Sequence, residues 1–327
     1  MSAASPVTVA DVHAARERIA PYVIRTPLTH SFLLGRQVGF DVWLKQENRQ
    51  HTGSFKPRGA LNKTMRLSDA ERSRGIVAAS AGNHALGVAY ACQVLGVDRA
   101  DVFVQATAAP AKIAKLQQYP AAVHLVGETF DKAQQAAWAF SRETGATFVS
   151  AYDDPAVIAG QGTCGLEIVD EMRNADTIIV PVGGGALIAG IALAAKSVNP
   201  RAHIVGVNPA ASPSARLSFQ RGHAIDPYEH GPTLAHGLAG GFGRTPFQVA
   251  RNLIDDIVLV TEEEIKRAIV TLIDTDQILA EASGVVGVAA ALYKKIALRG
   301  ATVIVVSGGN IDSGVLKSIL NDDSPTG

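Results

Sequence analysis

The segment from Thr52 to Ala60 places one lysine, Lys56, among turn-forming and small residues (TGSFKPRGA). An amine in such a segment can be partly removed from water and held neutral, as a lysine must be to form a Schiff base with an aldehyde cofactor. The alternative is a solvated loop lysine, which is the commoner situation for one lysine considered alone. Three further segments favour the chemical interpretation.

A run of glycines, Gly183–Gly185, stands between an apolar strand and an Ala-rich helix. Consecutive glycines let backbone N–H groups converge, and the helix start adds the positive end of a dipole, so this turn can hold a phosphate. The alternative is a tight turn without a ligand. A dinucleotide is disfavoured because Ile188 stands where G-x-G-x-x-G needs its third glycine, and the next strand ends in Asn208, not in an acid. A monophosphate is the favoured ligand.

Two more polar turns follow predicted strands. Ser80–His84 (SAGNH) precedes a predicted helix over Ala85–Leu95. Its N–H groups, with the Ser80 and Asn83 side chains, suit a small carboxylate or a phenolic oxygen. Ser307 opens the turn after the last predicted strand, at the end where open α/β sheets usually contact ligands. Each turn alone is more often ordinary loop chemistry, but the four segments together predict one site.

Apolar, β-rich runs alternate along the chain with segments of helical period. The predicted strands are residues 76–79, 101–104, 123–126, 146–149, 177–180, 203–207 and 302–306. Short apolar strands separated by helices indicate an α/β fold with mainly parallel sheets. Predicted helices include Glu128–Thr144 and Glu262–Asp276, and Thr261 with Glu264 has capping-box spacing. Gly231–Pro246 is expected to be a long loop, and loops of that length are often functional.

Length and composition limit the class of protein. The chain has 327 residues, enough for about two domains of roughly 150 residues each. Thirty basic residues balance thirty acidic ones, so neither nucleic acid nor a membrane surface is an expected partner. Ala186–Ala195 is too short to span a bilayer, and Met1–Ala10 has no cationic leader, so we expect a cytoplasmic protein. Cys92 and Cys164 make neither a metal-ligand spacing nor a disulfide framework, which fits a reducing compartment.

Together these segments resemble the fold-type II pyridoxal-phosphate (PLP) enzymes, in the short catabolic form of the serine/threonine dehydratase and serine racemase family. The resemblance spans about Val9 to Asp312 and includes the run Pro155–Thr163, which we expect to return the chain from the small domain to the large one. It implies a tryptophan synthase β-like α/β fold of two domains, each with a mainly parallel twisted sheet flanked by helices. Residues 1–74 and 152–327 would form the large PLP-binding domain, and 75–151 a small mobile domain that closes on the substrate. Family members are commonly dimers, so a homodimer is expected.

The resemblance also implies a role for each site residue. Lys56 would bind PLP as a Schiff base and then serve as the catalytic base. The other expected cofactor contacts are Phe55 against the ring, Asn83 on the phenolic oxygen, Gly183, Gly184, Gly185 and Ala186 around the phosphate, and Ser307 opposite the pyridine nitrogen. The expected substrate contacts are Ser80, Ala81, Gly82, Asn83 and His84 for the carboxylate, with His236 for the side chain.

The expected reaction is α,β-elimination from a β-hydroxy-α-amino acid, such as serine or threonine, giving a 2-oxo acid and ammonia. A hydroxyl from Ser307 at the ring nitrogen gives a weaker electron sink than a carboxylate, which favours loss of the β-hydroxyl over transamination. The resembled racemases place a second serine where this chain has Ala81, which cannot transfer a proton. The alternatives are an amino-acid racemase or a β-replacement enzyme of the same fold, and more remotely a non-catalytic protein that binds PLP or an amino acid.

Two further departures from the family pattern concern metal and substrate. Metal-activated members carry acids where this chain has Asn208 and Ser214, poor ligands for a hard divalent cation, so no metal site is expected. A monovalent ion held by backbone carbonyls stays open. His236 stands where many members have aspartate, and it is either a contact for the β-substituent or a loop histidine bonded to backbone. The first option points to a bulkier substrate, such as phenylserine or 3-hydroxyaspartate.

Overall fold

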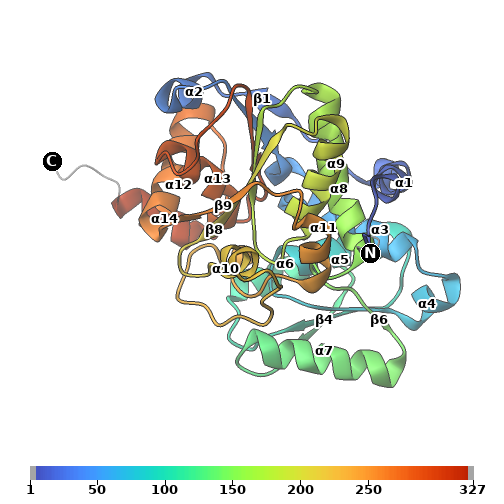
Figure 1. Cartoon of the computed structure of the whole chain (residues 1–327). Helices are drawn as coiled ribbons and strands as arrows, with labels where there is room; N and C mark the ends of the chain where they lie inside the picture. The colour runs from blue at the N-terminus through green and yellow to red at the C-terminus, as the bar shows by residue number, and fades with distance from the viewer. Residues whose placement is uncertain (1–4, 323–327) are drawn as a thin grey trace.

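The computed structural model describes residues 5–322. The ends of the predicted large domain, residues 1–4 and 323–327, lie outside the described residues, as does part of the Met1–Ala10 segment. Two separate sheets form, with strand orders β1-β2-β10-β7-β8-β9 and β5-β4-β3-β6 (Figure 1). Every strand pair is parallel except β1 with β2. The prediction of an α/β fold with mainly parallel sheets is therefore confirmed.

The larger sheet consists of β1 (Leu28–His30), β2 (Val42–Gln46), β7 (Thr177–Pro181), β8 (His203–Pro209), β9 (Asp256–Val260) and β10 (Thr302–Val306). The smaller sheet consists of β3 (Ile76–Ala79), β4 (Ala100–Val104), β5 (Ala122–Leu125) and β6 (Thr147–Phe148). Strands β1, β2 and β9 were not among the predicted strands. In β2 the reason is physical, because Lys45 interrupts its apolar pattern and is nevertheless fully buried.

Helices α5 (Asn83–Leu95), α6 (Pro110–Leu116) and α7 (Phe130–Thr144) lie in sequence between the strands of the smaller sheet. The other α-helices are α1 (Val9–Ile19), α2 (Phe32–Val38), α3 (Lys56–Met65), α4 (Asp69–Arg74), α8 (Pro155–Glu171), α9 (Ala186–Val198), α10 (Ser214–Arg221), α11 (Arg244–Ala250), α12 (Glu262–Asp276), α13 (Ala282–Leu292) and α14 (Ser313–Asp322). Short 3-10 turns are η1 (Ala20–Tyr22), η2 (Glu47–Arg49), η3 (His51–Gly53) and η4 (His236–Leu238).

Helices cover both faces of the larger sheet, and the alternation of side chains along each strand decides which face a residue joins. Ile179 on β7 and Ile304 on β10 pack with residues of α12 and α13. Their neighbours Ile178 and Val303 pack instead with α8 and α9. Figure 1 shows these two helix layers on opposite sides of the sheet, with the smaller sheet and α7 below them. Strands buried on both faces account for the continuous apolar runs in the sequence.

Several helix starts follow from their capping residues. The capping box of Thr261 and Glu264 opens α12 at Glu262, as predicted. Helix α7 begins at Phe130, two residues later than predicted, because Thr129 is extended and its side chain accepts a hydrogen bond from the Lys132 N–H. The run Pro155–Thr163 lies within α8, and Asp154 caps that helix. The predicted long loop 231–246 contains η4, and its last three residues form the first turn of α11.

A network of four buried charges lies behind the first turn of α3. The Arg58 guanidinium donates to both oxygens of Glu47 and both oxygens of Glu167 at 2.7–2.9 Å. Lys45 donates to Glu167 at 2.6 Å. Buried ions are costly unless they are paired and fully hydrogen-bonded, and here each carboxylate meets a cation. The network therefore ties α3 to β2, η2 and α8.

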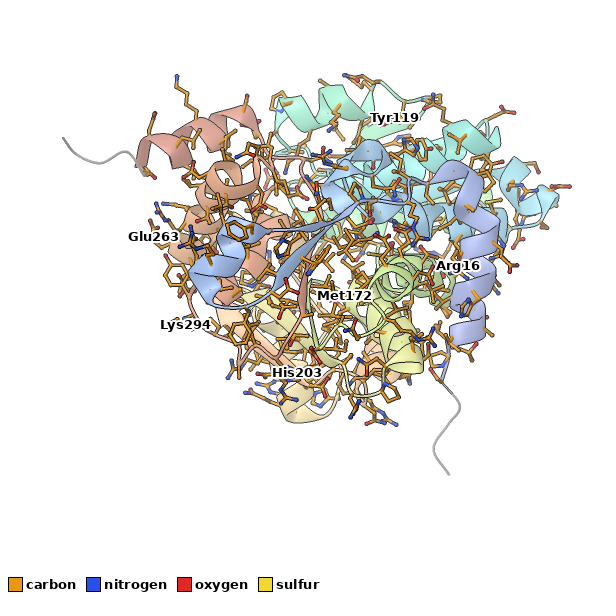
Figure 2. All side chains as sticks on the ribbon, turned by 90° about the horizontal axis from the view of Figure 1, so that it is seen from above. Arg16, Tyr119, Met172, His203, Glu263 and Lys294 are labelled. Atoms are coloured by element: carbon orange, nitrogen blue, oxygen red, sulfur yellow. The ribbon has the colours of Figure 1, made fainter. Side chains whose placement is uncertain are left out.

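Two further findings concern possible membrane spans and the cysteines. Within residues 5–322, no helix combines the length and the apolar character needed to cross a membrane. Cys92 on α5 and Cys164 on α8 are both free and buried. Figure 2 shows the side chains from above, with Tyr119, which follows α6, and His203, at the start of β8, on opposite sides of the molecule.

Candidate active site

Lys56 is the first residue of α3 and lies beside the turn that contains Ser307. Ser54 forms an isolated antiparallel bridge with Gly308. The Phe55 N–H donates to the Ser307 carbonyl at 3.2 Å. These backbone contacts bring together two of the four predicted segments, although they lie far apart in the sequence.

The Lys56 amine is largely removed from water. Its Nζ donates to the Ala151 carbonyl at 3.0 Å and lies 5.0 Å from the centre of the Phe55 ring. Burial lowers the pKa of Lys56 to about 8, and the nearby Glu281 carboxylate partly opposes this shift. Because burial disfavours the charged ammonium, a useful fraction of the amine is neutral near neutral pH. This is the state that a lysine needs in order to act as a nucleophile or base.

The glycine turn Gly183–Gly185 is packed closely against its neighbours, so that a side chain on any of its three residues would clash with them. A methyl group on Gly183 would lie 2.9 Å from the Gly237 carbonyl oxygen, and one on Gly184 would lie 2.1 Å from Tyr152 Cγ. Gly185 has φ +97°, a conformation that favours glycine, and it begins α9 without a side-chain cap. The first N–H groups of α9 therefore have no capping side chain, and such groups suit an anion.

The segment Ser80–His84 leads from β3 into α5, which begins at Asn83, two residues earlier than predicted. The Ser80 hydroxyl accepts a hydrogen bond from the Gly82 N–H at 3.1 Å. The Asn83 amide donates to Glu281 and accepts a hydrogen bond from the Asn310 amide at 2.6 Å. Both ends of this amide are thus bonded within the chain, so its contact with a cofactor oxygen stays a prediction.

The His84 ring is hydrogen-bonded within the chain, so its predicted contact with a substrate carboxylate stays a prediction. Its Nε2 is 2.8 Å from the Val149 carbonyl. Burial, with the charge of Lys56, lowers the pKa of His84 to about 3, so the ring is neutral. The ring ties α5 to the segment that carries the Ala151 carbonyl, the partner of Lys56. Binding of a carboxylate by this turn stays a prediction for its backbone and for Ser80.

Glu281 was not predicted, yet it contacts two of the predicted segments. Its carboxylate accepts the hydrogen bond from Asn83, and its backbone N–H donates to the Gly308 carbonyl at 3.0 Å. Burial raises the pKa of Glu281. The one signal in the sequence is an acid directly before the apolar helix α13, where helix dipoles favour negative charge. That rule alone does not place the acid near a lysine.

Ser283 links Ser307 to Gly237, the residue that follows His236. The buried Ser307 hydroxyl lies 3.4 Å from the Ser283 carbonyl, and the Ser283 hydroxyl accepts a hydrogen bond from the Gly237 N–H at 2.9 Å. His236 is exposed, and partial desolvation together with Lys112 lowers the pKa of its ring. None of the described residues hydrogen-bonds to that ring, which leaves its contact with a substrate side chain as a prediction.

Asn208 and Ser214, the two positions considered in the sequence for a metal ion, carry neutral side chains. Asn208 donates to the Val182 carbonyl at 2.7 Å and accepts a hydrogen bond from the Arg216 N–H at 3.2 Å. The buried Ser214 hydroxyl has no partner among the described residues. Within residues 5–322, no cluster of three or more His, Cys, Asp or Glu side chains could hold a metal ion.

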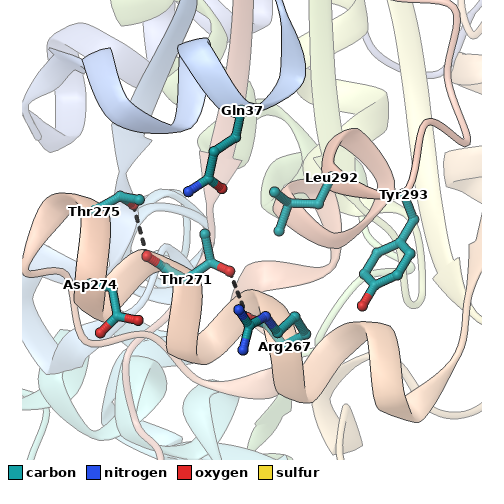
Figure 3. A pocket seen from close by; sticks show the side chains of 7 residues that line it. All are labelled: Gln37, Arg267, Thr271, Asp274, Thr275, Leu292 and Tyr293. Atoms are coloured by element: carbon teal, nitrogen blue, oxygen red, sulfur yellow. Dashed lines mark hydrogen bonds between the residues drawn. The ribbon is translucent and has the colours of Figure 1, made fainter. Parts of the chain in front are cut away.

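A surface pocket of about 310 Å³ lies elsewhere, between α2, α12 and the end of α13 (Figure 3). It is lined by Gln37, Arg267, Thr271, Asp274, Thr275, Leu292 and Tyr293. None of the predicted site residues is among them. The chemistry of the chain is therefore sought at Lys56 and not in this pocket.

Comparisons with known proteins agree with this geometry. The sequence profile of the family described as "Pyridoxal-phosphate dependent enzyme" matches residues 19–308. An L-threonine ammonia-lyase from Thermotoga maritima is 44% identical over 96% of this chain and 78% of its own. The L-threonine dehydratase catabolic TdcB of Escherichia coli is 40% identical over 94% of each chain. Maize serine racemase superposes with a TM-score of 0.91 at 33% identity, over 97% of this chain and 98% of its own. The family predicted from the four segments is confirmed, and this chain belongs to the pyridoxal-phosphate dependent enzymes.

Proposed function

We propose that this protein is a PLP-dependent dehydratase, an ammonia-lyase that converts a β-hydroxy-α-amino acid of the serine or threonine type to a 2-oxo acid and ammonia. The relatives named as threonine ammonia-lyase and threonine dehydratase, at 44% and 40% identity, support this assignment. The observation that carries it is the Lys56 amine, whose pKa is lowered to about 8 beside the Ser307 turn.

The residues present fit PLP. The start of α9 suits its phosphate, because the first N–H groups of that helix have no capping side chain. The neutral amine of Lys56 suits its aldehyde, and the adjacent Phe55 ring suits its aromatic ring. When bound, PLP supplies the electron sink that stabilises negative charge at the substrate α-carbon.

Each protein group has a defined task in this proposal. Lys56 would hold the cofactor through its amine, and the same amine would serve as general base for the substrate α-proton. A pKa near 8 suits that task, because a base works best when its pKa is close to the working pH. Ser307 offers the ring nitrogen a neutral hydroxyl. The proposed cofactor contacts are Phe55, Lys56, Asn83, Gly183, Gly184, Gly185, Ala186 and Ser307.

We assign substrate recognition to the turn from the smaller sheet and to η4. The N–H groups of Ser80–His84, with the Ser80 hydroxyl, would bind the α-carboxylate at the start of α5. His236 would face the β-substituent. Residues 75–151 would move as a small domain that closes on the substrate, against a large domain of residues 1–74 and 152–327. Support comes from the smaller sheet, whose four strands all lie between Ile76 and Phe148.

Maize serine racemase makes racemisation the second candidate. Ala81 argues against it, because a methyl group cannot return a proton to the face opposite Lys56. A coupled 2-oxo acid assay tests the choice, with each stereoisomer of serine, threonine, 3-hydroxyaspartate and phenylserine, and with Lys56→Ala as the control. We expect 2-oxo acid and ammonia from wild type only. Inversion of the substrate without formation of 2-oxo acid would identify a racemase. Formation of product only when a thiol is added would identify a β-replacement enzyme. Bound PLP without any turnover would identify a binding protein.

We also propose that the protein is a homodimer. Phe32 and Leu33 on α2 are 62% and 46% exposed, and Leu279 is 46% exposed. A hydrogen bond of 2.8 Å from the Ser31 hydroxyl to Asp276 joins these two segments. Exposed large apolar side chains in one region favour burial against a partner. Light scattering at assay concentration tests the proposal, and a monomeric mass would overturn it.

The cytoplasm is the proposed compartment. Cys92 and Cys164 are free and buried on separate helices, which suits a reducing environment. Fractionation of the native cells, followed by the dehydratase assay, tests the location. Activity confined to the secreted or membrane fraction would overturn it.

A further inference from the structure

A hydrogen-bonded pair of side chains, Tyr152 and Asp226, lies against the glycine turn and has no role in the chemistry above. The Tyr152 hydroxyl donates to Asp226 Oδ2 at 2.9 Å. Tyr152 precedes α8 and Asp226 follows α10, so the pair joins two segments that are distant in the sequence. Tyr152 also follows Ala151, whose carbonyl holds the Lys56 amine at 3.0 Å.

Three glycines make room for this pair. Methyl groups on Gly184 and Gly243 would lie 2.1 Å and 2.8 Å from atoms of the Tyr152 ring. A methyl group on Gly241 would lie 2.1 Å from an oxygen of Asp226. The Gly243 N–H donates to the Gly184 carbonyl at 3.1 Å, so the ring rests on two backbone segments that are bonded to each other. The Gly184 backbone is thus both hydrogen-bonded to Gly243 and packed against an aromatic ring.

The segment that carries Tyr152 is anchored on both sides of the ring. Asp153 accepts a hydrogen bond from the Thr245 N–H at 2.8 Å. Asp154 caps α8 and pairs with Lys63 at 2.6 Å. These contacts restrain the backbone, while the bond to Asp226 restrains the ring.

We propose that Tyr152 is a positioning residue for the phosphate of PLP: its ring braces the Gly184 peptide, and the bond to Asp226 keeps the ring in place. The inference rests on the proposed function, because it takes the glycine turn to be the phosphate site. Without the Tyr152 ring, the Gly184 peptide can rotate and the N–H groups of the turn no longer point at the phosphate. Loss of the ring therefore lowers the affinity for the phosphate. The covalent link through Lys56 does not depend on the brace.

The test separates these two contributions by comparing PLP with pyridoxal, which has the same aldehyde but no phosphate. The full-length protein freed of cofactor is titrated with each compound, and attachment to Lys56 is read from visible absorbance and from peptide mapping after borohydride reduction. Tyr152→Ala is expected to raise the Kd for PLP about tenfold, corresponding to about 1.4 kcal/mol, and to change the Kd for pyridoxal less than about twofold. Tyr152→Phe, which loses only the hydrogen bond, should raise the Kd for PLP about threefold.

Two matched controls refine the test. Tyr228→Phe alters a tyrosine in the same loop as Asp226 and should leave both Kd values unchanged. Gly241→Ala should reproduce Tyr152→Phe by displacing Asp226, whereas Gly231→Ala meets only ordinary contacts, the nearest at 3.6 Å, and should be neutral. Thermal unfolding of each variant checks that the fold is retained.

The outcomes are distinct. Weaker binding of PLP but not of pyridoxal in Tyr152→Ala supports the inference. An unchanged Kd for PLP in that variant, or an equal loss for both compounds, overturns it while the proposed function stands. Failure of wild type to attach PLP at Lys56 would overturn the proposed function itself, and the inference with it.

Discussion

Attachment of PLP to Lys56 should accelerate with pH along a titration curve whose midpoint lies at about 8. Burial of the amine penalises its ammonium form, so the pKa falls and the neutral nucleophile appears at lower pH than for a solvated lysine. With a pKa of about 8, about one amine in ten is neutral at pH 7. For an ordinary lysine with a pKa of 10.5 the fraction is about one in 3,000, so the expected advantage is about 300-fold.

The assay mixes cofactor-free protein with PLP between about pH 6 and about pH 10 and follows the visible absorbance of the covalent link. Nα-acetyl-lysine treated in the same way is the control, and it corrects for ionisation of PLP itself. Dividing the protein rate by the control rate removes the shared effect of PLP ionisation. Because the control amine titrates as an ordinary lysine, the ratio should stay level below about pH 8 and fall above it. A ratio that stays level up to about pH 10, as expected if Lys56 also titrates near 10.5, would refute the argument from burial.

Three further predictions follow from individual contacts. Glu281→Gln removes the carboxylate that raises the pKa of Lys56, so the midpoint of the same curve should move to lower pH, and a move to higher pH would contradict the assignment. Ala81→Ser adds a hydroxyl able to transfer a proton, and chiral chromatography should detect D-serine formed from L-serine; an unchanged product mixture would count against that reading. Arg58→Leu leaves two buried carboxylates without their guanidinium and should lower the free energy of unfolding in denaturant titrations by roughly 3–5 kcal/mol. Arg16→Leu breaks an exposed ion pair and, as the control, should cost less than about 1 kcal/mol, so equal losses would refute the argument.

Much of the fold could be predicted from local patterns. Capping residues and apolar runs act over a few neighbouring positions, which is why the start of α12 at Glu262 was predicted correctly. Strand β2 was not predicted, because local patterns do not explain a buried lysine. Lys45 is stable inside the strand only because it pairs with Glu167, which is distant in the sequence. The short antiparallel strand β1 likewise depends on pairing with β2.

Residue types and their order along the chain are enough to identify the groups available for chemistry: one lysine among turn residues, three glycines before a helix, and a hydroxyl after the last strand. These features are local, because they depend on side-chain type and on backbone freedom. The behaviour of these groups depends on how the chain packs. Packing lowered the pKa of Lys56 by burying it beside Ala151, brought Glu281 to Asn83, and bonded the His84 ring to the Val149 carbonyl. Burial and long-range partners arise only when distant segments pack together, and no short stretch of sequence contains them.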